Sequence, residues 1–426
     1  MVASSGIPVV PELPSSDSST STGSSTSDES SMDNSHSSPD YELSHEIALK
    51  WRAPMHASQL RPVPASTLFF ARDTLQRLPS KGERFDDIIN ANGVPFAFKP
   101  AALKAMAILL ASQRFSVVLR RPWGFGLPTF VSMVSAMLDI DFHPRKDPFL
   151  SLSQWMGASP PIDHVLHANY VLQLDFATLR GKELRDTLLA YVYSAVIDFI
   201  EHYELLPQDF PPLERWPSDE PAALIWGLVG FLKGHLGLHQ QPQHRLCLIV
   251  GNFDAPLTAF RDGPKILNPF LRSLQQANWV GKISGLLLWS CIDDNGSVGA
   301  CRYRKSGSMP LGKPPRGVAA VASLPDAIDF THHPALQSAV GFTEKEVNEL
   351  DAVTRHLAPK DSDADPLPLL QVLKNERLIP YFFSCPWTRK ENPLADLEPA
   401  LDEVPVYSTG DVLEILSERY LLAPKF

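Results

Sequence analysis

Four short apolar segments, separated by long stretches of helical pattern, constrain the fold of this chain more than any other feature. Buried parallel strands are continuous apolar runs because helices cover both faces of their sheet. Strands that alternate with helices favour such a sheet. The sequence therefore predicts an α/β fold with a mostly parallel sheet flanked by helices. The expected strands are Phe115–Arg120, Tyr170–Asp175, Arg245–Val250 and Ile283–Cys291.

Helical periodicity between and after these strands predicts the elements that cover the sheet. The very apolar helix at 221–236 is expected to pack on the sheet rather than to form an interface. The Asp-rich stretch at 360–366 predicts a boundary, so we expect a main domain at 49–357 and a small C-terminal helical segment at 358–426. The expected helices are 101–112, 128–140, 182–206, 221–236, 267–278, 344–356, 367–374 and 410–420.

The first 48 residues differ in composition from the rest, being rich in Ser, Thr, acidic residues and Pro. Such a segment cannot bury enough apolar surface to offset its ordering entropy, so a disordered tail is predicted. It is expected to act as a solubilising extension, with a phosphorylation platform as the alternative. Eight acids and no Lys or Arg precede Lys50, so only -2 of the formal net charge of -10 belongs to residues 50–426.

The nearly balanced charge of residues 50–426 argues against the broad basic surface that binds nucleic acid. The four cysteines form no Cys-x-x-Cys pair, and no zinc site or disulfide framework is expected. No apolar run approaches the ~20 residues of a membrane span, and no signal peptide is recognised. These features predict an intracellular protein, cytoplasmic or nuclear, whose partner is an unidentified protein.

A glycine-containing segment, Arg121-Pro-Trp-Gly-Phe-Gly-Leu-Pro-Thr129, joins an expected strand to an expected helix. Loops in this position bind phosphate when they have the form Gly-x-x-x-x-Gly-Lys-Ser/Thr, because backbone N–H groups surround the phosphate, lysine adds charge and the hydroxyl holds magnesium. Aligning Gly126 with the second glycine places Leu127 at the lysine and Pro128 at the hydroxyl. The remaining candidates for phosphate contact are Arg121, Gly124, Gly126 and Thr129.

A second candidate position follows the expected strand at 245–250, where acidic residues would bind magnesium and polarise water. Gly251 and Asn252 occupy the two most useful positions, and Asp254 is the one acid nearby. Asp254 is therefore the one candidate catalytic residue. The alternative for Asp254 is a cap or turn residue, and no metal ligand set is assigned.

These segments resemble the AAA-ATPase-like family of fungi and bacteria. Arg121-Pro122 and Phe125-Gly126 are similar to its Arg-Pro-Arg-Arg-Phe-Gly-Lys-Ser loop, and Asp254-Ala255-Pro256 to the end of its Asp-Glu-Tyr-Asp-Ala-Pro segment. Three further segments resemble family segments in the same order. They are Leu172–Phe176, Gly341–Val347 and Val406–Tyr407 with Val412–Leu413.

The resemblance covers residues 85–420 and implies a P-loop NTPase-like core. It differs from the family where chemistry would take place, at Leu127, Pro128, Gly251 and Asn252. Family members often carry a PD-(D/E)XK-type nuclease domain, which is not expected in this chain. The resemblance therefore implies a degenerate, non-hydrolysing interaction module or nucleotide-responsive scaffold. The alternative is an active ATPase that binds ATP and magnesium through displaced residues such as Arg121, Thr129 and Asp254.

Overall fold

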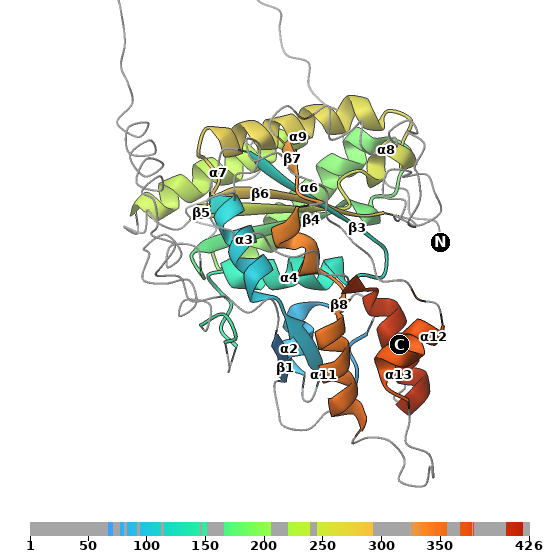
Figure 1. The fold of residues 1–426 in the computed structure, drawn as a ribbon. Helices are drawn as coiled ribbons and strands as arrows, with labels where there is room; N and C mark the ends of the chain where they lie inside the picture. Colours follow the sequence, from blue (N-terminus) through green and yellow to red (C-terminus); the bar gives the residue numbers. More distant parts are fainter. Residues whose placement is uncertain are drawn as a thin grey trace, which may run out of the picture. The chain divides into compact units, whose positions relative to one another are not determined.

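A five-stranded parallel sheet with the order β4-β5-β6-β3-β7 forms the centre of the computed structural model (Figure 1). Its strands are β3 (Ser116–Pro122), β4 (Asn169–Asp175), β5 (Arg245–Gly251), β6 (Gly285–Ile292) and β7 (Ala327–Asp329). The structure describes residues 67–70, 77–80, 83–91, 94–111, 115–144, 147–150, 166–205, 220–238, 245–292, 324, 327–331, 333–355, 367–376, 378 and 406–420, all within the compact unit Ala48–Phe426.

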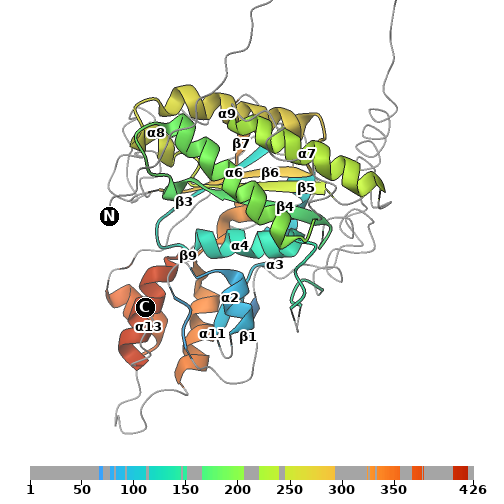
Figure 2. The same cartoon turned by 180° about the vertical axis from the view of Figure 1, so that it is seen from behind.

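Helices cover both faces of the sheet, as Figures 1 and 2 show. Alternate residues of each strand point to opposite faces, and both sets are apolar. In β5, Leu246, Leu248 and Val250 pack in one cluster with α6 (Leu184–His202), α7 (Pro221–Leu238) and α9 (Gly263–Trp279). Cys247 and Ile249 pack in the other with α3 (Pro100–Ala111) and α4 (Leu127–Leu138). Burial on both faces explains the apolar runs in the sequence.

A smaller group of elements lies beside α4 and has its own apolar cluster, which contains Val347, Leu373, Tyr407 and Leu416. Two short antiparallel pairs, β1 with β2 and β8 with β9, belong to this part of the fold. The remaining elements of the fold are β1 (Thr67–Phe70), α2 (Phe85–Asn90), β2 (Pro95–Phe98), η2 (Phe176–Thr178), α8 (Ala255–Ala259), η5 (Pro334–Ala339), β8 (Phe342–Thr343), α11 (Glu344–Thr354), α12 (Leu369–Asn375), β9 (Val406–Tyr407) and α13 (Thr409–Tyr420).

The predicted α/β architecture with a parallel sheet flanked by helices is confirmed, and all four expected strands are present. The fifth strand, β7, was not expected because its three residues give little periodicity. The expected tail at 1–48 and the boundary at 360–366 lie outside the described residues. Within the described chain, no helix is both long enough and apolar enough to cross a membrane.

Candidate functional site at the carboxyl end of the sheet

The loop after β3 consists of Trp123–Gly126, because β3 continues through Pro122 and α4 begins at Leu127. Gly124 and Gly126 have φ angles of +94° and +78°, in the left-handed region that side chains with a Cβ rarely adopt. This loop leads to a helix on one face of the sheet, whereas the loops after β4 and β5 lead to helices on the other face. Ligands of open parallel sheets bind where the connections diverge in this way.

Arg121 lies in β3 and not in the loop, so its expected place at the start of a phosphate-binding loop is wrong. Its side chain is fully buried, and its guanidinium donates to three backbone carbonyl oxygens. Two of these acceptors, Thr331 and Leu336 (2.8 Å), belong to the segment that follows β7. Arg121 therefore fixes this segment against the sheet, and no part of its side chain reaches solvent.

A phosphate-binding loop would need a cation and a free hydroxyl in the first turn of α4. Here the two positions hold apolar side chains, and the hydroxyl that follows them is bound to the backbone. Leu127, the first residue of α4, stands where lysine would be expected and is fully buried in the core cluster shared with α3. Pro128 lies in the first turn, where its missing N–H leaves no helical hydrogen bond unmade. The hydroxyl of Thr129 donates to the backbone oxygen of Glu83 at 2.7 Å.

The backbone oxygens of the loop are bound by the C-terminal part of the fold. The N–H of Gly410 donates to the oxygen of Gly124 at 2.8 Å, and the N–H of Gly341 donates to the oxygen of Phe125 at 2.8 Å. The hydroxyl of Thr409 also donates to the oxygen of Phe125, at 3.1 Å. A Cβ at Gly126 would lie 3.2 Å from this hydroxyl, so the C-terminal segment packs closely on the loop.

The indole ring of Trp289 fills the space in which an acidic side chain at residue 251 would lie. Gly251 ends β5, and a Cβ added to it would lie 2.6 Å from the ring of Trp289 on the adjacent strand β6. Trp289 is 8% exposed and belongs to the core. The next residue, Asn252, has a φ of +47° and donates its amide to the carboxylate of Asp175 at 2.8 Å.

Asp254 lies just before α8 and accepts a hydrogen bond from the hydroxyl of Ser290. Ser290 is itself buried in β6. Asp254 lies in a turn directly before the first residue of α8, which agrees with the cap-or-turn alternative, although its carboxylate makes no side-chain cap hydrogen bond. Within the described residues, no group of three or more His, Cys, Asp or Glu side chains is arranged to hold a metal ion.

A cavity of about 100 Å³ lies beside the loop. Gly124, Gly126 and Thr129 line it, whereas Arg121 and Asp254 do not. The rest of its wall is mainly apolar and comes from the loop, α2, β2, α4, the segment at 339–342 and α13, including Phe96, Phe125, Met133, Val340 and Leu413. The structure thus brings together three of the candidate residues and separates the other two from them.

A buried ion pair at the edge of the cavity was not expected from the sequence. Lys99 lines the cavity, and its amine contacts both carboxylate oxygens of Glu346, at 2.5 and 2.7 Å, and the backbone oxygen of Gly341, at 3.0 Å. Lys99 is 3% exposed and Glu346 is fully buried. Buried Lys and Glu are rare unless paired, but no local sequence pattern joins residues 247 positions apart. Gly341 and Glu346 do belong to a segment that the resemblance identified.

Comparison with known proteins adds no relative of this chain. No protein-family model matches the sequence, and neither a curated protein nor a solved structure is significantly similar to it. The geometry of the site therefore carries the functional argument.

Proposed function

We propose that this chain contains a P-loop NTPase-like domain, of the AAA-ATPase-like kind, that does not hydrolyse ATP and acts by binding another protein. The parallel sheet, the two left-handed glycines and the helix that follows them support the P-loop assignment. The proposed role is that of an interaction module. The balanced charge of residues 50–426 supports a protein partner over nucleic acid.

The contact between Gly251 and Trp289 carries the proposal. A site that has merely lost a carboxylate leaves room for water or for a neighbouring acid, but here an aromatic ring occupies the space and belongs to the core. Leu127 is likewise packed in the core at the lysine position. Apolar side chains thus fill the places of both the acid at residue 251 and the lysine at residue 127. This packing favours a domain whose function is not phosphoryl transfer.

The size of the cavity also favours a site that is not built for a nucleotide. Small-molecule sites in proteins measure roughly 300–1,000 Å³, whereas this cavity measures about 100 Å³. Among the described residues that line the cavity, the one Lys or Arg is Lys99, and its amine is already paired with Glu346. Trp123 is 54% exposed beside the cavity, and exposed aromatic side chains of this kind often anchor protein interfaces.

Isothermal calorimetry with ATP and Mg²⁺, together with a phosphate-release assay, tests the proposal on the full chain. We expect no binding heat and no phosphate release. We expect the same of the double variant Leu127→Lys/Pro128→Ser, because it restores the loop residues but neither the acid at 251 nor the space for a nucleotide. Circular dichroism is needed to establish that the double variant is folded.

Two other outcomes would change the assignment. Binding heat without phosphate release would favour a nucleotide-responsive scaffold. Magnesium-dependent phosphate release that disappears in Asp254→Ala and persists in Asp86→Ala would establish an active ATPase and refute the proposal. Asp86 is a suitable control because its side chain does not line the cavity and forms a partly exposed ion pair with Arg84.

A further inference from the structure

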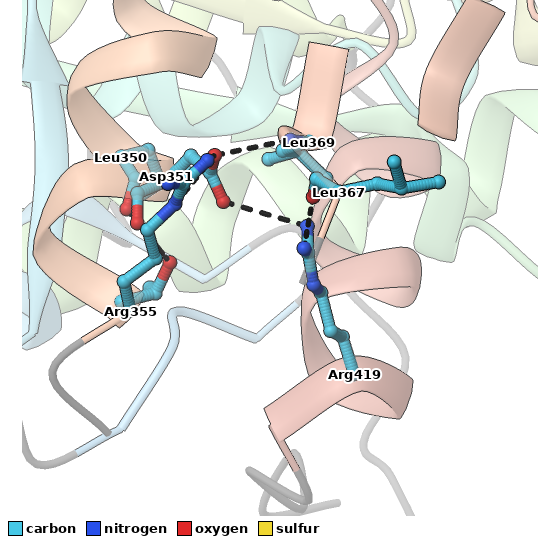
Figure 3. Close-up of polar contacts among 7 residues, drawn as sticks. Leu350, Asp351, Arg355, Leu367, Leu369 and Arg419 are labelled. Carbon is cyan, nitrogen blue, oxygen red and sulfur yellow. Dashed lines mark hydrogen bonds and ion pairs between the residues drawn. The ribbon is translucent and has the colours of Figure 1, made fainter. Parts of the chain in front are cut away.

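A buried carboxylate joins the three helices of the smaller part of the fold (Figure 3). Asp351 of α11 accepts from Arg355 at 2.8 Å, from the N–H of Leu369 at the start of α12 at 3.0 Å, and from Arg419 of α13 at 3.5 Å. Arg419 also donates to the backbone oxygen of Leu367. We refer to Asp351, Leu367, Leu369 and Arg419 as the Asp351 junction. It is formed by segments that are far apart in the sequence.

Helix α13 is held at both of its ends. Near its first residue, Thr409 and Gly410 donate hydrogen bonds to backbone oxygens of the loop Trp123–Gly126, which we refer to as the glycine loop. Near its last residue, Arg419 binds the Asp351 junction. Twelve helical residues span about 18 Å at 1.5 Å per residue, and rigid secondary elements are among the structures that carry energetic coupling between sites.

Helix α11 completes a closed path between the same two places. Asp351 lies on α11, and the segment just before this helix contains Gly341, whose N–H binds the oxygen of Phe125 in the loop. The Lys99–Glu346 pair anchors the first turn of α11 close to this contact. The glycine loop and the Asp351 junction are thus connected through α13 on one side and through α11 on the other.

We infer that α13 couples the conformation of the glycine loop to the Asp351 junction, so that loosening either end loosens the other. The inference does not depend on whether the loop binds a nucleotide. A partner protein that engages the junction would change the loop, and an occupant of the cavity would change the junction. Coupling of this kind is reciprocal, because one coupling free energy describes both the effect of the junction on the loop and the effect of the loop on the junction.

Amide hydrogen exchange on the full chain tests the coupling from the junction end. In Arg419→Ala, the amides of Gly410 and Gly341 exchange roughly tenfold faster, which corresponds to losing about one hydrogen bond to a charged group. The matched control is Arg355→Ala. It removes a partner from the same carboxylate but leaves α13 attached, so these two amides keep their wild-type exchange rates.

The reciprocal experiment starts from the loop. Thr409→Val removes the hydroxyl that binds Phe125 but keeps the shape of the side chain, and we expect faster exchange at the amide of Leu369, which donates to Asp351. Thr409→Ser keeps the hydroxyl and leaves this amide unchanged.

Three results would overturn the inference. The first is unchanged exchange at Gly341 in Arg419→Ala. The second is an equal acceleration in Arg355→Ala, which indicates a general loss of stability. The third is unchanged exchange at Leu369 in Thr409→Val. The reciprocal pair keeps the inference testable if Arg419→Ala does not fold.

Discussion

At residue 251 the backbone of β5 passes against the indole ring of Trp289, and this single contact separates what the sequence can reveal from what it cannot. The sequence shows that residue 251, which follows an apolar run, is a glycine and not an acid. The ring that fills its place is 38 positions away in the numbering and becomes a neighbour only through the pairing of Gly251 with Trp289 in the sheet. Side-chain filling of this kind requires the strand order, which no local pattern contains.

Introducing an acid at residue 251 tests the packing directly. We expect Gly251→Asp to lower the free energy of unfolding by about 2–4 kcal/mol, because the new side chain overlaps the indole and buries a charge. Chemical denaturation measures this cost. In a Trp289→Leu background the cost of the same change is smaller, since residues in contact are not additive.

Gly230→Asp is the control for Gly251→Asp, because it also replaces a glycine by aspartate but at an exposed position. Nothing lies within 4 Å of a Cβ at Gly230, which is exposed on α7, so the change is expected to alter stability by no more than about 0.5 kcal/mol. A cost of Gly251→Asp that is equal in the wild-type and Trp289→Leu backgrounds would contradict the proposed overlap.

Arg121 illustrates the same limit for a charged residue. Next to a glycine loop, an arginine suggests phosphate contact, and the sequence alone offers no competing partner. In the structure its partners are the backbone oxygens of Thr331 and Leu336, more than 200 positions away. The glycine pattern located the loop, but the role of Arg121, which lies just before it in β3, depends on a segment that no local pattern connects to it.

Elements that are long and apolar were predicted well, and short ones were not. The four central strands and the four long helices between them, α4, α6, α7 and α9, carry seven or more residues of clear pattern. The strands β7, β8 and β9 have three, two and two residues and exist because neighbouring backbone pairs with them. Their formation depends on tertiary contacts, so local propensity gives little sign of them.

Helix α11 combines two stabilising devices in its first turn. The hydroxyl of Thr343 accepts from the N–H of Glu346, and the carboxylate of Glu346 accepts from the N–H of Thr343, which is a capping box. The same carboxylate neutralises Lys99. One side chain therefore starts the helix and compensates a buried cation at the edge of the cavity.

Removing the charge of Glu346 should be far more harmful than removing the cap alone. We expect Glu346→Gln to lower the free energy of unfolding by about 3–5 kcal/mol, because Lys99 then remains buried without its counter-charge. Thr343→Ala should cost about 1 kcal/mol. In the double variant Lys99→Met/Glu346→Gln, the loss should be smaller than in Glu346→Gln. Equal losses in the single and double variants, measured by denaturation, would argue against the importance of the pair.

At the scale of the whole molecule, the strand β7 lies at one of the two edges of the sheet. Polar side-chain contacts as well as backbone pairing attach it to β3. Arg120 of β3 forms an ion pair with Asp329 of β7, and the backbone N–H of Arg120 donates to the hydroxyl of Thr331 at 3.0 Å. Burial by itself raises the pKa of Asp329, but the charge of Arg120 and hydrogen bonds from Thr331 outweigh it and hold the pKa below its ordinary value.

This lowered pKa predicts a contribution to stability that depends on pH. A carboxyl group whose pKa is lower in the folded state stabilises the fold above its unfolded pKa of about 4, and the contribution is lost as the pH falls through the folded pKa. The difference in unfolding free energy between wild type and Asp329→Asn should therefore be largest near pH 7 and shrink below about pH 4. A difference that stays constant down to pH 2 would refute this role for Asp329.

The contact between Gly251 and Trp289 also bears on how this sequence can change over time. A chain that carries tryptophan at 289 cannot accept an acid at 251 in one step without the overlap described above. The tryptophan has to be replaced first, at a cost to the core, and only then does the acid have room. Gain of an acid at this position therefore requires passage through a less stable intermediate sequence, so the two residues act together as a barrier to that change.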